Sequence, residues 1–255
     1  MRYNFIDKFY HEYPSLFSTA FKTISRNLKK KKFEPEVEAL NKIVGPGQTC
    51  IDVGGAYGRY AFPLSMIVGP EGKIFSFEPG RYSYRVLRIV KWFHRLKNVF
   101  IYKLAISDKK GSVNLCLPVK KTGKIGASLA FISETGQDNA VCEAVDMTTI
   151  DDFCKDNGVN GVSFIKCDTE GSEFLVFRGA QGAIKRSRPV VLTEVDIGNM
   201  SRYGYKPSDL EDFFSPLGYK IFAYKSGGFV SIKRIVENGN YFFVPEGRSL
   251  NSVTG

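Results

Sequence analysis

The chain has 255 residues, enough for one sizeable α/β domain with its own core, and its hydrophobic content of 43% and charged content of 24% are ordinary for a folded protein. No apolar run approaches the roughly 20 residues that span a bilayer, and the first residues lack the apolar stretch of a signal peptide. The five cysteines are scattered without metal-site spacing, so we expect reduced thiols and a cytoplasmic protein.

The net charge of +10 is concentrated in two segments. Residues 1–33 hold eight Lys or Arg and two acids, and residues 81–103 hold seven Lys or Arg and no acid. This local concentration of positive charge indicates surfaces that bind an anionic partner, rather than a charge that serves only to keep the protein in solution.

Residues 1–33 are predicted to be an amphipathic helical extension. Apolar side chains recur there at steps of three and four residues, at Phe5, Phe9, Tyr13, Leu16, Phe17, Ala20, Ile24 and Leu28. Four lysines, 29–32, close the stretch. Such a segment either lies on the inner face of a membrane or packs on the domain or on a second subunit. A second helix should begin at Pro35.

Residues 34–255 are predicted to form a single domain. Strands are expected near 49–53, 73–77, 98–105, 162–167, 189–195, 219–224 and 241–244, and helices near 58–68, 81–96, 148–157, 173–184 and 207–215. This alternation predicts an α/β fold with a seven-stranded, mostly parallel sheet, helices on both faces and a C-terminal antiparallel hairpin. Residues 109–145 interrupt the alternation as a β-rich insertion, with short strands expected at Ser112–Leu117 and Ser128–Ile132.

The end of the first strand predicts a cofactor site. Asp52 precedes a glycine-rich turn in which we expect Gly54, Gly55, Tyr57 and Gly58 to bind the cofactor. The spacing is not that of the dinucleotide fingerprint. An acid before the first glycine suits S-adenosylmethionine, which carries an ammonium and a sulfonium and no phosphate.

The next two strand ends extend this site. Glu78 follows the second strand, about one βαβ unit after Asp52, where a carboxylate can accept both ribose hydroxyls. The third strand ends at Ala105 and Ser107, which we expect beside the adenine, Ala105 against its face and Ser107 or Asp108 near its amino group.

A second group of acids predicts the chemistry. Asp168, Glu170 and Glu194 end neighbouring strands, and crowded carboxylates raise one another's pKa toward a range useful for proton transfer. Asp168 or Glu170 is the expected base for a substrate hydroxyl, and Glu194 is expected to orient it. A divalent metal held by these oxygens is the alternative, although no metal site is assigned. Glu173 falls in the first turn of a helix, where an acid has a structural role.

These motifs resemble the FkbM family of class I S-adenosylmethionine-dependent methyltransferases, over roughly residues 34–246. The segments that carry the resemblance are 51–58, 69–79, 105–108, 164–173 with Gly179-Ala180, 188–194 and 241–245. The resemblance implies a Rossmann-like class I fold and O-methylation, often of a sugar hydroxyl on a glycan or natural product. Ala56 departs from the family pattern, which usually has Asn there.

Two other functions remain open from the sequence. The sequence pI near 9.3 is compatible with an RNA methyltransferase as an alternative function. However, no amine-methylation motif follows the 162–167 strand, and nucleic acid is not the expected partner. A non-catalytic protein that keeps the cofactor fold is the other. The expected acceptor is a sugar, a glycan or a small molecule, and the basic segments also allow an acceptor that is anionic or linked to a lipid. The sequence leaves open whether the chain forms a homo-oligomer.

Overall fold

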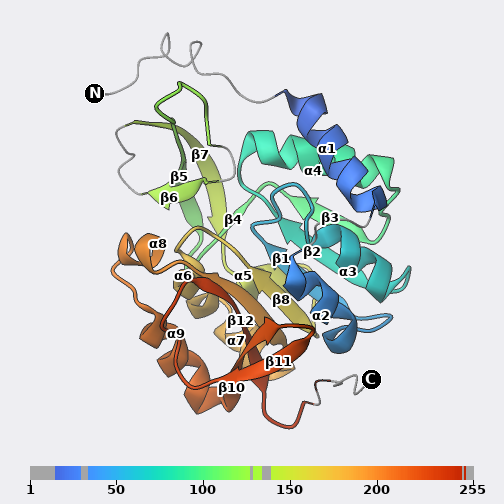
Figure 1. Ribbon diagram of the computed structural model, residues 1–255, viewed down its shortest axis with the longest axis vertical. Helices are drawn as coiled ribbons and strands as arrows, with labels where there is room; N and C mark the ends of the chain where they lie inside the picture. Colours follow the sequence, from blue (N-terminus) through green and yellow to red (C-terminus); the bar gives the residue numbers. More distant parts are fainter. Residues whose placement is uncertain (1–14, 30–33, 127–128, 134–138, 249, 251–255) are drawn as a thin grey trace.

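The computed structural model describes residues 15–29, 34–126, 129–133, 139–248 and 250. An eight-stranded sheet runs through the centre in the order β11-β10-β12-β9-β8-β1-β2-β3 (Figure 1). Its strands are β1 (Thr49–Val53), β2 (Lys73–Phe77), β3 (Val99–Tyr102), β8 (Phe164–Cys167), β9 (Val190–Val195), β10 (Tyr219–Lys225), β11 (Gly228–Ile232) and β12 (Gly239–Pro245).

The five strands from β3 to β9 pair in parallel, and β12 lies antiparallel between β9 and β10. The Rossmann-like α/β class is therefore confirmed, with one correction to the expected seven strands. A hairpin that turns at Ser226-Gly227 joins β10 to β11. The sequence prediction lacked the strand β11, and the last strand that it did predict corresponds to β12. No residue of β11 is buried, and the strand has little apolar periodicity, so its signal in the sequence is weak.

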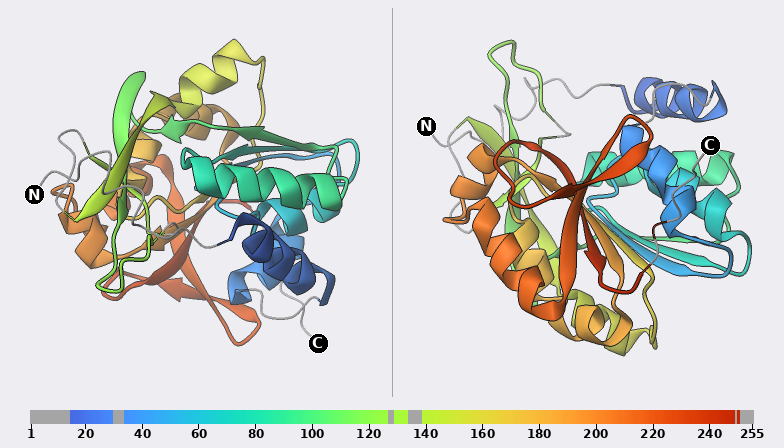
Figure 2. Two further views of the ribbon diagram at one scale, coloured as in Figure 1. Left: turned by 90° about the horizontal axis from the view of Figure 1, so that it is seen from above. Right: turned by 60° about the horizontal axis from the view of Figure 1, so that its bottom comes forward.

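Helices cover both faces of this sheet (Figures 1 and 2). Alternate side chains of the buried strands enter two apolar clusters, with Ile51 in one and Cys50 in the other. One face carries α5 (Ile150–Asp156), α6 (Glu173–Arg178), α7 (Gln181–Ser187) and α9 (Pro207–Phe214), with α8 (Ile197–Ser201) nearby. The other carries α2 (Pro35–Ile43), α3 (Ala61–Val68) and α4 (Arg81–Phe93).

The N-terminal helix α1 (Leu16–Lys29) forms an outer layer on α4. Ala20 and Ile24 of α1 pack on Val86 and Val90 of α4. The predicted helix is therefore present from residue 16, and its predicted apolar positions Phe5, Phe9 and Tyr13 lie outside the described residues. No helix in the described parts of the chain has the length and apolar character needed to cross a membrane.

The insertion builds a second sheet of four strands, in the order β4-β7-β5-β6. Its strands are β4 (Ala105–Ile106), β5 (Gly111–Pro118), β6 (Phe131–Ser133) and β7 (Ala140–Thr148). The expected strand 98–105 is thus divided, with β3 in the main sheet and β4 in the second. Figure 1 shows this sheet standing beside α6 and α8, at the end of the main sheet where the parallel strands finish.

The expectation that all five cysteines are reduced is wrong for two of them. Antiparallel pairing places Cys116 of β5 directly opposite Cys142 of β7, and a disulfide joins them. Their separation of 26 residues gave no local signal, because only the strand register brings them together. Cys50, Cys154 and Cys167 are free and buried.

Candidate active site

A cavity of about 290 Å³ lies where β1, β2, β8 and β9 end. Its wall combines the turn after β1, the acid after β2, the start of β4 and the acids that follow β8 and end β9. Ligands of open α/β sheets bind at this edge, beyond the carboxyl ends of the strands. The residues that line the cavity include Asp52, Gly54, Gly55, Ala56, Glu78, Ala105, Asp168, Glu170 and Glu194.

The turn after β1 touches the turn after β8. The Asp168 N–H donates to the carbonyl of Val53 at 3.1 Å. A Cβ atom at Gly54 would lie 1.8 Å from the carbonyl oxygen of Asp168, and Gly54 has φ of +77°. Only glycine fits at this position, because a side chain would separate the two turns. The glycine-rich turn after β1 and the acids that follow β8 are therefore held side by side.

Asp52 is buried beneath the turn. Ser76 of β2 donates a hydrogen bond from its Oγ to the Asp52 Oδ2 at 2.9 Å. Burial raises the pKa of Asp52 to about 6, although the Ser76 hydrogen bond and Lys166 oppose the rise. A Cβ atom at Gly55 would lie 2.2 Å from the same Ser76 Oγ, so the second glycine also has a steric reason.

Glu78 binds two backbone amides at once. Its Oε2 accepts from the Ala56 N–H and its Oε1 from the Gly80 N–H, each at 2.8 Å. Burial is the main cause that raises the pKa of this carboxyl to about 7, against these two bonds. A carboxylate has about four acceptor positions, so two remain for ligand hydroxyls. The backbone of the turn at Gly54, Gly55 and Ala56 lines the cavity beside the free acceptor positions of Glu78, an arrangement that fits a nucleoside with a cationic tail.

The third strand end contributes apolar wall rather than polar contacts. Leu104, Ala105 and Ile106 line the cavity. Ser107 does not: it is buried, its N–H donates to Thr148, and it borders a different cavity. Of the residues predicted in the glycine-rich turn, Tyr57 and Gly58 also lie outside the cavity wall. The Tyr57 ring packs edge-on against Tyr82, with centroids 6.3 Å apart.

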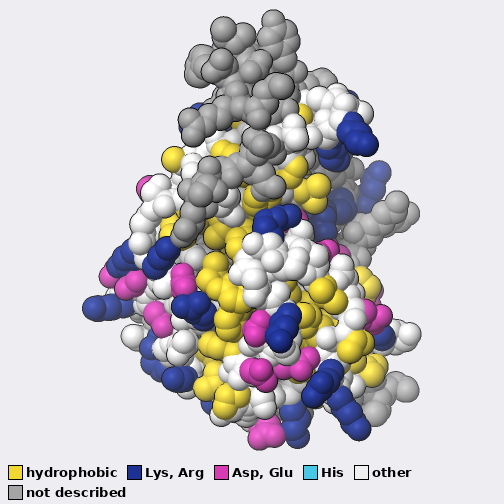
Figure 3. All heavy atoms as spheres, turned by 90° about the vertical axis from the view of Figure 1, so that its left-hand side faces the viewer, with side chains coloured by type: hydrophobic (Ala, Val, Ile, Leu, Met, Phe, Trp, Pro, Cys, Tyr) yellow, Lys and Arg dark blue, Asp and Glu magenta, His cyan; other side chains and the backbone are white. Residues whose placement is uncertain are grey.

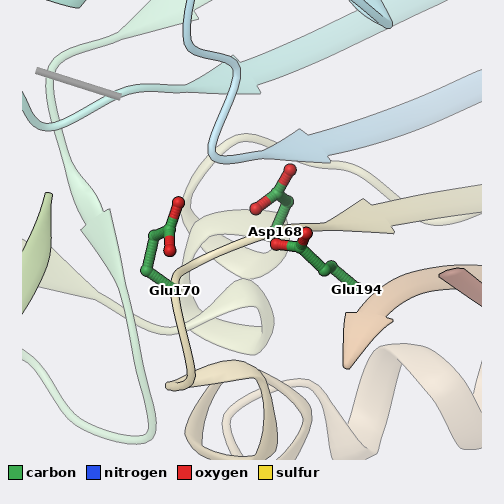
Figure 4. A group of neighbouring side chains, drawn as sticks. All are labelled: Asp168, Glu170 and Glu194. Carbon is green, nitrogen blue, oxygen red and sulfur yellow. The ribbon is translucent and has the colours of Figure 1, made fainter. Parts of the chain in front are cut away.

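The three predicted acids do come together (Figure 4). One oxygen from each of Asp168, Glu170 and Glu194 can be chosen so that all three lie within 4.8 Å of one another. Figure 4 shows the carboxylates of Asp168 and Glu194 facing each other, with Glu170 to one side. Asp168 and Glu194 are about 26 residues apart in the chain, and they come together because β8 and β9 pair in parallel and end at the same edge of the sheet.

A buried lysine distinguishes Asp168 from the other two. Lys166 is 2% exposed, and its Nζ lies 3.2 Å from the Asp168 Oδ2 and 5.0 Å from the centre of the Tyr60 ring. Burial favours the neutral acid, but the Lys166 ammonium and the Glu194 hydrogen bond outweigh it and lower the pKa of Asp168. Burial and the negative Asp168 raise the pKa of Glu194 to about 8. At neutral pH Glu194 therefore carries a proton that it donates to ionised Asp168.

Glu170 sits on a strained turn. It has φ of +56°, a left-handed conformation that costs a non-glycine residue about 1–3 kcal/mol. Asn199 of α8 donates from Nδ2 to its Oε2 at 2.9 Å. Burial first, and then the charges of Asp168 and Glu173, raise the pKa of Glu170 to about 7.

Glu173 maintains this turn, as the sequence prediction of a structural role requires. It is fully buried, and its Oε1 accepts hydrogen bonds from the Thr169 N–H at 2.7 Å, the Thr169 hydroxyl at 3.1 Å and the Gly171 N–H at 3.2 Å. These bonds fold the chain back between β8 and α6 and present Glu170 to the cavity.

Sequence reasoning missed Lys166, which lies behind the cavity wall, and several residues of the wall itself. Lys166 offered a signal, because a lone lysine in an apolar strand must have a buried partner. Glu34, Arg59 and Tyr60 offered none, since Glu34 precedes α2 and the others precede α3. In the structure Arg59 pairs with the Glu34 carboxylate, and the Tyr60 hydroxyl donates to it at 2.6 Å.

Comparison with known proteins places the chain in a family. A family model described as a methyltransferase FkbM domain matches residues 52–221, more than half of the chain. No curated protein sequence matches the chain.

Solved structures share the arrangement at low identity. The methyltransferase FkbM from Methylobacillus flagellatus KT is 16% identical with a TM-score of 0.48 over 77% of this chain, which spans only 43% of that protein. A SAM-dependent O-methyltransferase from Thermotoga maritima is 14% identical with a TM-score of 0.46, covering 92% of this chain and 73% of the other. A SAM-dependent methyltransferase from Aquifex aeolicus is 18% identical, with a TM-score of 0.44 and coverage of 86% and 96%.

Ala56 generates a first prediction. It has φ of +43°, which costs an L-residue about 1–2 kcal/mol, whereas glycine adds about 0.4–1 kcal/mol of unfolded-chain entropy. We expect Ala56→Gly to raise the free energy of unfolding by about 0.5–1 kcal/mol, measured by urea denaturation. Ala56→Val should lower it, because a β-branched residue tolerates this conformation least. Equal stability of the two variants would contradict the strain at Ala56.

The raised carboxyl pKa values generate a second. Between the ordinary glutamate value and about 8, the folded protein holds more protons on Glu170 and Glu194 than the unfolded chain does. Stability should therefore fall as the pH rises through this range. Glu194→Gln should make the fall shallower in denaturation curves recorded between pH 5 and 8. Glu71→Gln, at an exposed site, should follow the wild type, and identical slopes for all three proteins would refute the assignment.

Proposed function

The chain belongs to the FkbM family of class I S-adenosylmethionine-dependent methyltransferases, and we propose that it methylates a hydroxyl oxygen of a sugar, a glycan or a related small molecule. One observation carries the proposal. The turn suited to the cofactor and the three acids suited to a hydroxyl line a single cavity, and the contact of Gly54 with Asp168 fixes them together.

The cofactor supplies a methyl group already activated by the sulfonium, so the protein needs to position the acceptor and remove its proton. Glu170 is the proposed base. Its raised pKa of about 7 suits proton removal near neutral pH, and its carboxylate is held by Asn199 at the cavity wall. Asp168 suits this role less, because its pKa is lowered and Lys166 and Glu194 already bind it.

The Asp168–Glu194 pair is proposed to orient the acceptor. In the protonation state derived above, Glu194 supplies a hydroxyl donor and Asp168 supplies acceptor positions, side by side at the ends of β8 and β9. Adjacent hydroxyls of a sugar offer the matching donors and acceptors, which supports a sugar acceptor. Divalent metal remains the less favoured alternative for these oxygens, because the Lys166 ammonium at 3.2 Å already balances part of their charge.

Replacing the proposed base generates a third prediction. Glu170→Gln keeps the shape of the side chain and should lower kcat by about 10²–10⁴-fold, the usual contribution of a positioned base. Binding of S-adenosylmethionine, measured by isothermal titration, should stay within a few-fold of the wild type. Turnover is measured with labelled methyl donor against a panel of glycan and nucleotide-sugar acceptors.

The controls separate the roles of the acids. Glu38→Gln, on the exposed side of α2, should leave turnover unchanged. Asp168→Asn should abolish turnover and retain the cofactor, and it is preferable to Asp168→Ala, which would leave the buried Lys166 without its partner. Near-normal turnover of Glu170→Gln would exclude it as the base, and failure of the wild type to bind S-adenosylmethionine would exclude an enzyme of this class.

A peripheral membrane contact through α1 is also part of the proposal. Beside the face that packs on α4, α1 carries a stripe of exposed apolar side chains, Phe17 at 75%, Phe21 at 71% and Leu28 at 64% exposure. Lys22, Arg26 and Lys29 follow on the next side of the helix. Aromatic and basic side chains arranged in this way suit the surface of an anionic bilayer.

Liposome co-sedimentation gives the fourth prediction. The full-length protein should pellet with vesicles that contain phosphatidylserine, and Phe17→Ser combined with Phe21→Ser should release most of it to the supernatant. Both side chains are exposed, so folding should survive the change. Met66→Ser, an equally exposed apolar position on α3, is the control. Equal pelleting of all three proteins would end the membrane proposal.

A further inference from the structure

A second cavity of about 650 Å³ adjoins the first. It lies between the insertion sheet, α6 and the segment that contains α8, and Ile132 of β6 lines both cavities. Figure 3 views the molecule from the side of the insertion and shows apolar side chains along this face, with Lys and Arg side chains among them. Ile132 therefore belongs to the walls of both cavities, which places the second cavity next to the one that holds the acids.

Arg202 connects this cavity to Glu170. Its guanidinium lies 4.1 Å from the centre of the Phe131 ring, a contact that fixes the plane of the group. Its Nη2 donates to the Asn199 Oδ1 at 3.3 Å, and the Nδ2 of the same Asn199 donates to Glu170 at 2.9 Å. Asn199 is thus shared between the proposed base and this arginine.

The guanidinium of Arg202 is positioned yet keeps binding capacity. Among the described residues, no carboxylate lies within ion-pair distance of it. Arginine has five N–H donors in a planar fork that matches carboxylate and phosphate oxygens. Stacking and the Asn199 bond reduce the entropy that such a group would lose on binding a ligand.

A second arginine of the cavity also favours the binding of a carboxylate or a phosphate. Arg178 of α6 pairs with Asp108 at 3.2 Å and donates to the Tyr205 hydroxyl at 3.4 Å, so it too is held in place. Among the described residues of the cavity wall, two carry guanidinium groups, Arg178 and Arg202, and Asp108 is paired with the first of them. These groups lie next to a site whose own acids repel anions.

We propose that the second cavity holds an anionic group of the acceptor, a carboxylate or a phosphate bound by Arg202 with Arg178, while a hydroxyl of the same molecule reaches Glu170. This rests on the proposed O-methyltransferase function and narrows its substrate class to acidic or phosphorylated sugars. Among the described residues, six acids and Arg59 line the first cavity, whereas Arg178 and Arg202 line the second. An anionic group therefore directs its own end of the acceptor to the second cavity and leaves the hydroxyl end to the acids.

Binding, rather than turnover, tests this assignment. In the presence of S-adenosylhomocysteine, saturation-transfer NMR and titration calorimetry compare glucose with glucuronate and with glucose 1-phosphate. The charged sugars should bind more tightly than glucose. Arg202→Gln should weaken them by about 10–100-fold, as expected for a lost charge-assisted hydrogen bond, while leaving the affinity for S-adenosylhomocysteine unchanged. Comparison of the two anions identifies whether carboxylate or phosphate is preferred.

Matched variants make the outcome decisive. Arg202→Lys should restore part of the affinity, and Arg85→Gln, which removes an exposed arginine of α4, should have no effect. Equal affinity for glucose and both anions, or equal loss with Arg85→Gln and Arg202→Gln, would overturn the proposal. Anion binding that depends on Arg202 without methyl transfer to any acceptor would support the cavity assignment while counting against the proposed reaction.

Discussion

The site depends on the close contact between the ends of β1 and β8. The Asp168 N–H binds the Val53 carbonyl, and Gly54 makes room for the Asp168 carbonyl. This contact makes one cavity out of two strand ends that are more than 100 residues apart in the chain. If the two turns lay a side chain's width further apart, the glycine-rich turn and the acids would line separate cavities.

Electrostatic differences then assign separate roles to three similar carboxyl groups. Lys166 forms its ion pair with Asp168, so this acid is stabilised as an anion, while burial and the charge of Asp168 keep a proton on the neighbouring Glu194. Glu170 stays outside that pair because its strained turn, fixed by Glu173, directs it toward Asn199. Burial and a cation behind the cavity wall therefore act together on the protonation of the site, and the cation is what separates Asp168 from the other two acids.

Much of this arrangement could be predicted from local sequence, and the limits have physical reasons. Strand ends of a parallel sheet meet at one edge, so Asp52, Glu78, Asp168 and Glu194 could be placed together from their positions in successive βα units. Contacts that depend on register or on helix packing had no such signal, as the Cys116–Cys142 disulfide shows. Ser107 was assigned to the adenine because strand 98–105 was taken as continuous, whereas the chain leaves the main sheet before β4.

Because the chain leaves the main sheet before β4, the insertion sheet forms no backbone pairing with the main sheet in the part of the chain that the structure describes. Of the strands described, those of the second sheet pair only with one another, and the short β4 connects them to the end of β3. The insertion contributes Ile132 and Phe131 to the cavities but no strand to the main sheet. A change in this segment would therefore alter the walls of both cavities without disturbing the strand pairing that holds the turn after β1 against the acids.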